Sequence, residues 1–498
     1  MYQSTAPRPT PPLGPRLLPI ALAVLLTACA GLPDPAPTET PRAVPPQWSA
    51  GSARADVSAT DLSAWWQRFD DPALASLITK ALDANTGVQS AQAALRQARA
   101  LADKARAGLG PSVSASGSAQ RSQSGDSDAS NTFKAGVGAS WEPDLFGGNR
   151  AAASASDTDA QASAASLSNV RILLAAEVAT SYITLRGLQA RLAIARSNLA
   201  AQTETLQITR WRAQAGLVSS LDVEQAVSAA EQTQAQIPAL QTSVAQTLNA
   251  LAVLTGQAPG TLNTTLGDAA PIPPAPADLA LAFPADTLRQ RPDVRAAELK
   301  LHSAWSRVAV ADAARYPSLS LSGSLGLSSL TLGHLVDSAS LLKSVLASVS
   351  APLFDGGAAK AQVRAQEAAL DQARASYQGT VLTALQDVED ALVAIQGDGE
   401  RLMRLQAAAT AAANAELLAR QRYGSGLIDF ATVLVTQRSL LSAQDSVAST
   451  QASLSANHVR LYRALGGGWT PDRAASAPAA PVATPQAAVR PTTAAAAN

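Results

Sequence analysis

Residues 316–329 read YPSLSLSGSLGLSS, and this stretch decides the class of fold. Leu319, Leu321, Leu325 and Leu327 alternate with serine or glycine, and a period of two is typical of a β-strand. The pattern predicts a strand over about 317–327 with one apolar face and one small, polar face. Such a strand fits a membrane β-barrel with a wet lumen. It fits a soluble antiparallel sheet with one dry face equally well.

Three further segments alternate in the same way, over about residues 112–121, 131–142 and 343–352. Four strands in one sheet have two free edges, which the hydrocarbon core of a membrane does not tolerate. Four strands are also too few to close a barrel. If these strands enter a membrane, several chains must combine them, and two, three or four protomers would give 8, 12 or 16 strands.

The segments around the strands occur twice, which indicates a tandem duplication. The corresponding segments are 108–114 and 314–320, 145–148 and 353–357, and 210–217 and 420–427. They lie about 206 to 210 residues apart, as expected for two copies with small insertions or deletions.

The duplication predicts a simple organisation of the chain. It comprises a signal peptide (1–28), a Pro-rich linker (29–60), repeat 1 (61–267), a Pro-rich joint (268–284), repeat 2 (285–468) and an Ala/Pro-rich tail (469–498) that is expected to be disordered.

Long helices are predicted to follow the strands in both repeats. Residues 149–214 and 357–423 contain no proline and carry apolar residues at heptad spacing, so each could form a helix about 100 Å long. The partner segments, about 72–108 and 219–253, are half as long, and two end to end match one long helix. Pro238 is expected to bend or interrupt the second partner. Helices of this length are predicted to pack side by side in a bundle or tube.

The N-terminal segment resembles the signal peptide of a bacterial lipoprotein. Residues 1–16 contain Arg8 and Arg16 and no acidic residue, and residues 17–27 (LLPIALAVLLT) are an apolar run too short to span a bilayer. Leu26-Thr27-Ala28-Cys29 resembles the lipobox, which implies that Cys29 is lipidated and becomes the mature N-terminus. By the same resemblance, Ala30 implies the outer rather than the inner membrane.

The composition excludes several classes of function. The chain has 38 basic and 38 acidic residues, so general attraction to nucleic acid is not expected. It has no run of 18 apolar residues that would predict a transmembrane helix. A single cysteine excludes a disulfide framework, and His302, His334 and His458 lack the spacing of metal ligands. No catalytic constellation stands out, so neither an enzyme nor a cofactor site is expected.

Several motifs, in order along the chain, resemble the TolC-like outer-membrane factors, and specifically their lipidated branch. They are Trp65-Trp66 followed by Asp71-Pro72, Trp141-Glu142-Pro143-Asp144-Leu145-Phe146-Gly147, Arg291-Pro292-Asp293-Val294-Arg295, Ala351-Pro352-Leu353-Phe354-Asp355-Gly356-Gly357, and Arg422-Tyr423 with Gly426-Leu427-Ile428-Asp429-Phe430. The resemblance covers about residues 60–468. The chain departs from it at Val435-Thr436, where this branch often has Asp-Ala, and in its C-terminal tail.

The resemblance implies a mainly α-helical homotrimer. Its long-helix hairpins would form a periplasmic α-barrel of twelve helices, and four strands per chain would join a 12-stranded outer-membrane β-barrel. It implies a lipid-anchored channel of a Gram-negative outer membrane, a passive exit duct for small molecules driven by an inner-membrane pump through a periplasmic adaptor. The alternatives are a type I protein-secretion duct on the same fold and a non-channel periplasmic lipoprotein scaffold. The scaffold would give no reason for four amphipathic strands.

The turns of the two helical hairpins are the candidate functional sites. Each places arginine at a helix end and glycine after it, as helix C-caps do. An acid follows in each, Asp222 or Asp429, and is expected in the first turn of the next helix, where Asp222 could serve the helix start alone. Arg420 or Arg422 could bridge to Asp429. The resemblance implies that these tips face the periplasm, meet the adaptor and close the tube. The candidate gate or docking residues are Arg210, Gly216, Asp222, Arg420, Arg422, Tyr423, Gly426 and Asp429.

Overall fold

The computed structural model describes residues 45, 47–48, 62–276, 287–288 and 290–469. The predicted signal peptide, Cys29 and nearly all of the predicted tail lie outside the described residues. In the part of the chain that is described, no helix is both long enough and apolar enough to cross a membrane.

The first half of the chain leads from short helices through a β-hairpin to a helical hairpin. Its elements are the 3-10 helix η1 (Trp65–Phe69), α2 (Pro72–Ala84), α3 (Thr86–Ala107), β1 (Ser112–Ser122), β2 (Ser130–Trp141), α4 (Gly148–Gln214), α5 (Ser220–Leu254) and the short α6 (Asn263–Leu266). Local signals set the helix starts, since the Asp71 side chain accepts from the amides of Ala73 and Leu74.

The second half repeats the order of helix, two strands, long helix and shorter helix. Its elements are α8 (Pro292–Ala313), β3 (Ser318–Ser329), the 3-10 turns η2 (Leu332–His334) and η3 (Ser338–Ser340), β4 (Leu341–Ser350), α9 (Ala358–Gly424) and α10 (Phe430–Ala464). β4 begins two residues before the predicted 343, directly after η3. The two halves therefore carry matching elements.

The long helices α4 and α9 have 67 residues each, or about 100 Å. Pro238 does not interrupt the helix, because α5 continues from Ser220 to Leu254 with this proline inside it, and the alternative expectation of a bend stays a prediction. Pro238 has no N–H to donate to the carbonyl of Gln234. Gln234 lies at an exposed position, where water can satisfy that carbonyl.

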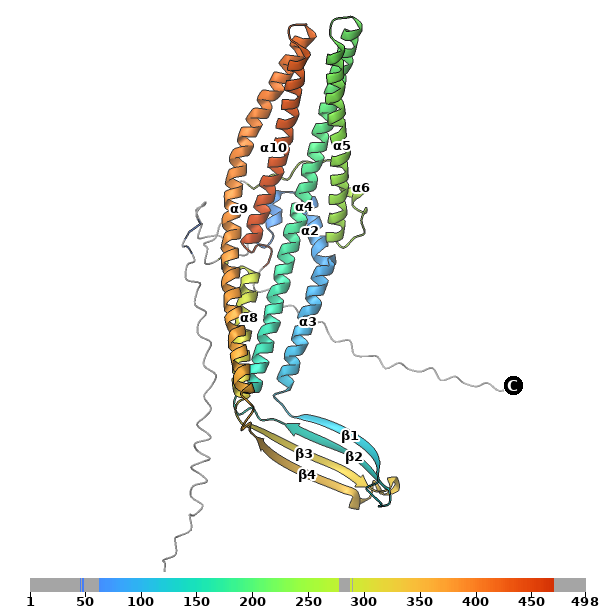
Figure 1. Ribbon diagram of the computed structural model, residues 1–498, viewed down its shortest axis with the longest axis vertical. Coiled ribbons are helices and arrows are strands. Elements are labelled where there is room, and N and C mark those ends of the chain that lie inside the picture. Colours follow the sequence, from blue (N-terminus) through green and yellow to red (C-terminus); the bar gives the residue numbers. More distant parts are fainter. Residues whose placement is uncertain (1–44, 46, 49–61, 277–286, 289, 470–498) are drawn as a thin grey trace, which may run out of the picture.

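The helices form one elongated layer in which the helices of the first half lie beside those of the second half (Figure 1). α4 packs against α3 and α5 on one side and against α8 and α10 on the other, and α9 packs against α8 and α10. Since α3 and α5 lie end to end along α4, two shorter helices match one long helix, as the lengths predict. The layer has two open long edges, one along α3 and α5 and one along α9, where Leu382, Val393 and Met403 are exposed.

The core where the two halves join is aromatic. The Trp65 ring stacks on Tyr462 with centroids 5.6 Å apart, and Phe69 meets Tyr462 edge to face. Beside this core, Arg291 donates to the carbonyls of Ala384 and Ala464 and pairs with Asp293 and Asp387. Arg291 thereby fixes the start of α8 against α9 and the end of α10.

The strands form one antiparallel sheet in the order β1-β2-β3-β4, at one end of the helices (Figure 1). Residues directly opposite each other share a face, and Ala115, Val137 and Leu325 lie opposite one another in turn. This apolar face includes Val113, Val345 and Val349, each at least 70% exposed in the single chain. The other face is mostly serine and glycine, so the sheet separates its faces as the alternation predicts.

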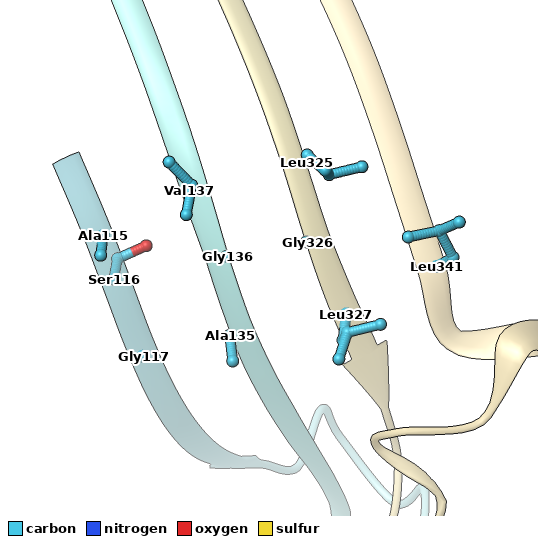
Figure 2. Close-up of a pocket in the computed structure, with 10 residues that line it drawn as sticks. All are labelled: Ala115, Ser116, Gly117, Ala135, Gly136, Val137, Leu325, Gly326, Leu327 and Leu341. Atoms are coloured by element: carbon cyan, nitrogen blue, oxygen red, sulfur yellow. The ribbon is translucent and has the colours of Figure 1, made fainter. Parts of the chain in front are cut away.

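A glycine pair brings β2 and β3 unusually close. Gly136 lies opposite Gly326, and the two face each other in Figure 2. A Cβ atom on Gly136 would lie 2.9 Å from the Gly326 Cα, and one on Gly326 would lie 2.9 Å from the Ala135 carbonyl oxygen. Only glycine fits both positions without moving the strands.

Candidate functional site

The two helical hairpins end in turns of the same backbone design. Gly216 and Gly426 have φ angles of 73° and 75°, the left-handed region that favours glycine. The amide of Leu217 donates to the Arg212 carbonyl at 2.8 Å, and that of Leu427 donates to the Arg422 carbonyl at 2.9 Å. These bonds satisfy the free carbonyls of α4 and α9, so both glycines serve the helix C-termini.

The acids that follow the turns occupy different positions from each other. Asp222 is the third residue of α5 and forms a capping box with Ser219. Asp429 is the N-cap of α10, one position before the predicted first turn, and its carboxylate accepts from the hydroxyl and amide of Thr432. These hydrogen bonds lower the pKa of Asp429 below its ordinary value. Both acids therefore hold helix starts.

Tyr423 is the centre of contact between the two hairpins. Its side chain is 3% exposed and packs edge to face against Phe430, with ring centroids 5.8 Å apart. Its hydroxyl lies 3.3 Å from the Thr209 hydroxyl on α4. The Arg212 guanidinium lies 4.5 Å from the centroid of its ring, which is a cation–π contact.

Arg212 also donates to the carbonyl of Gly424 at 2.8 Å. We name Thr209, Arg212, Tyr423 and Gly424 the inter-hairpin cluster. The positively charged Arg212 side chain lies over the Tyr423 ring and donates to a carbonyl at the end of α9. It thereby holds the end of α4 to the end of α9.

The remaining candidate arginines contribute less to this contact. Arg420 pairs with Glu204 of α4 at 3.5 Å and with Glu416 of its own helix at 3.8 Å, and these are its ion pairs within the described residues. Within the single chain Arg420 therefore pairs with glutamates, and a bridge from Arg420 or Arg422 to Asp429 in a trimer stays a prediction. Arg210 and Arg422 are exposed.

Sequence reasoning missed Thr209, Arg212 and Glu204 as functional candidates. Arg212 was visible as a helix-end arginine, but its partner Gly424 lies 212 residues further along the chain. Only the packing of the two halves side by side in one helical layer brings these residues together. Among the described residues, no three His, Cys, Asp or Glu side chains are grouped as a metal site would require.

The elongated helical layer with a four-stranded sheet at one end is similar in fold to solved outer-membrane channels. The chain matches the family model described as "Outer membrane efflux protein" over residues 77–257 and 283–467. The chain belongs to the outer membrane efflux protein family.

Individual members support this assignment. The chain is 34% identical over 461 residues to the toluene efflux pump outer membrane protein TtgC of Pseudomonas putida, which covers 90% of this chain and 94% of TtgC. Its fold matches the outer-membrane channel OprN with a TM-score of 0.78 and 35% identity, over 86% of this chain and 99% of OprN. It matches the open state of the Neisseria gonorrhoeae MtrE channel with a TM-score of 0.78 and 29% identity, over 85% of this chain and 96% of MtrE.

These matches confirm the predicted TolC-like resemblance, the fold class, the outer-membrane location and the efflux-channel function. The family is one of outer-membrane channel proteins. Lipidation of Cys29 and the roles of the hairpin residues stay predictions.

Proposed function

We propose that three copies of this chain form a passive exit duct for small toxic molecules. The duct would consist of a 12-stranded β-barrel and a periplasmic tube of helices, fed by an inner-membrane pump through a periplasmic adaptor. The trimer is inferred from one observation. β1 and β4, the edge strands of the described sheet, each pair with a neighbouring strand on one side only, and an apolar sheet face in contact with lipid requires that such edges be paired. The toluene efflux named for the relative TtgC supports a small-molecule cargo.

The hairpin tips are the proposed adaptor surface. Leu217 and Leu427 are 73% and 74% exposed at the two turns, beside the left-handed glycines Gly216 and Gly426. An exposed leucine on a rigid turn is a suitable anchor for an apolar pocket of a partner protein. Lipidation of Cys29 would add an anchor to the same membrane.

The inter-hairpin cluster is the proposed closure of the tube. It ties α4 to the end of α9, and a widening of the periplasmic end that separates the two hairpins would break it. The adaptor would supply the free energy by binding the tips in the open arrangement better than in the closed one.

Native mass spectrometry and planar bilayers test the proposal together. The protein purified in mild detergent should appear as a trimer and should insert as a channel of low conductance that adaptor addition increases. A folded monomer without conductance would contradict the pooled barrel. A trimer whose conductance does not change when the adaptor is added would contradict the proposed role of the tips in adaptor binding.

A further inference from the structure

Three charged side chains lie on the four strands, and all three are basic: Arg121, Lys134 and Lys343. Lys343 lies opposite Leu325, so it shares the apolar face of the sheet. Arg121 follows Ala119 by two residues and shares that face too. Lys134 lies opposite Ser118 and Ser328 on the small, polar face. Two cations therefore point toward lipid in the proposed barrel.

Both lipid-facing cations lie near the end of the sheet that is far from the helices (Figure 1). Arg121 is the last residue but one of β1, and Lys343 is the third residue of β4. With the helices in the periplasm, this end reaches the outer leaflet of the outer membrane. At that depth a long basic side chain can extend toward the head groups.

The duplication places these two cations together at each seam between subunits. Ser112 corresponds to Ser318, 206 residues later, and Val137 to Val345, 208 residues later. β1 therefore corresponds to β3, and β2 corresponds to β4. The register in which β2 pairs with β3 thus predicts the register in which β4 pairs with β1 of the next chain. In this register Lys343 corresponds to Ala135 and Arg121 to Leu327, which lie directly opposite each other. If the register of β4 against β1 of the next chain is shifted by two residues, Lys343 and Arg121 still share one face as diagonal neighbours. Their long side chains can still reach each other.

The pair of Ala135 and Leu327 is apolar, whereas the seam pair would be two like charges. Like charges opposite each other destabilise a strand pair unless an anion lies between them. Leu325, which lies opposite Lys343, lines a shallow depression of about 610 Å³ together with Leu341, Ala135 and Leu327 (Figure 2). The seam thus combines two cations with an adjoining apolar surface, which suits a phosphate attached to acyl chains.

We infer that each subunit seam binds a phosphate of lipid A, the acylated glycolipid of the outer leaflet, between Lys343 of one chain and Arg121 of the next. This inference rests on the proposed trimer. The trimer in detergent is titrated with hexa-acylated lipid A, and bound lipid is counted by native mass spectrometry. We expect up to three molecules per trimer and at least tenfold weaker binding to the double variant Arg121→Gln with Lys343→Gln.

Lys134→Gln is the matched control, since it removes a strand cation from the other face and should bind lipid A as the parent does. The swap Arg121→Lys with Lys343→Arg keeps both charges and should also bind. Lipid A without its phosphates should bind the parent as weakly as the double variant. Equal binding of phosphatidylglycerol would overturn the assignment to lipid A.

The two possible failures are distinguishable. Absence of a parental trimer contradicts the proposed function. A parental trimer that binds lipid A no better than the double variant contradicts this inference alone and favours pairing of the cations with the loop carboxylates Asp126 and Asp128. A disulfide between Lys343→Cys and Arg121→Cys tests the seam independently of lipid, and its absence in a folded trimer would also count against the site.

Discussion

Arg212 and Tyr423 are the side chains on which closure of the proposed tube depends most. The hydrogen bond from the Arg212 guanidinium to the Gly424 carbonyl is exposed to solvent and contributes about 1 kcal/mol, and the contact with the Tyr423 ring adds about 0.5–1 kcal/mol. Three such clusters would hold a closed trimer by several kcal/mol in total, within the range that binding of a partner protein can supply.

The first prediction concerns this cluster. Arg212→Gln should raise single-channel conductance severalfold in planar bilayers, and Tyr423→Phe should raise it less, because it removes only the 3.3 Å contact with Thr209. Arg210→Gln, two residues away at an exposed position, is the control and should leave conductance at the parental value. Parental conductance in Arg212→Gln would show that the cluster does not limit the aperture.

The second prediction concerns pH and Asp429. Its pKa is lowered in the folded protein because the Thr432 hydroxyl and amide donate to the carboxylate. Its contribution to the start of α10 is therefore present above the ordinary pKa of 3.8 and is lost as pH falls through the lowered value. Hydrogen exchange at the Thr432 amide, measured against unstructured peptides, should lose protection over that acidic range. In the variant Asp429→Asn the asparagine still caps the helix but does not titrate. The same loss of protection at acidic pH in this variant would show that another group causes the loss.

At the scale of the element, the β2–β3 pair depends on the contact between Gly136 and Gly326. The third prediction is that Gly136→Ala lowers the trimer fraction in non-boiled gels severalfold, because the new methyl group would lie 2.9 Å from the Gly326 Cα. Gly138→Ala is the matched control on the same strand and face. Its methyl group would lie 3.8 Å from the nearest atom, an ordinary contact, so the trimer should persist. Equal trimer loss in both variants would refute the close-approach argument.

The elements themselves could largely be predicted from the sequence, since their signals are local. Alternation along 316–329 and heptad spacing along 149–214 each repeat within a few residues, and the structure has β3 and α4 there. The course of α5 at Pro238 could not be predicted, because it depends on whether water reaches the carbonyl of Gln234. The inter-hairpin cluster could not be predicted either, because it joins residues more than 200 positions apart.

At the scale of the whole molecule, one exposed aromatic marks the surface that the proposed trimer must cover. Phe146, between β2 and α4, stacks on Tyr316 with centroids 4.9 Å apart. Its counterpart Phe354, between β4 and α9, is 93% exposed in the single chain. The duplication aligns Tyr316 with Gly110, which leaves space for Phe354 of a neighbouring chain beside the start of β1.

The fourth prediction follows from this surface. Phe354→Ser should lower the trimer fraction in detergent by severalfold while leaving the helical content of the chain unchanged, as measured by mass photometry and circular dichroism. Leu145→Ser, a half-exposed position beside the intrachain stack, is the control and should assemble normally. Full assembly of Phe354→Ser would place the subunit contact away from this junction.

The two unlike hairpins of the chain have an evolutionary consequence. A ring of six identical single repeats would carry six equivalent tips, each offering the same side chains to both neighbours. In the fused chain the position of Tyr423 is Ala213 in the first repeat, so only alternate tips offer the aromatic ring that Arg212 contacts. Fusion of the two repeats and the later divergence of their sequences therefore leave two sets of three equivalent tips in place of six equivalent tips. One set of tips can move to widen the periplasmic opening while the other set stays in place.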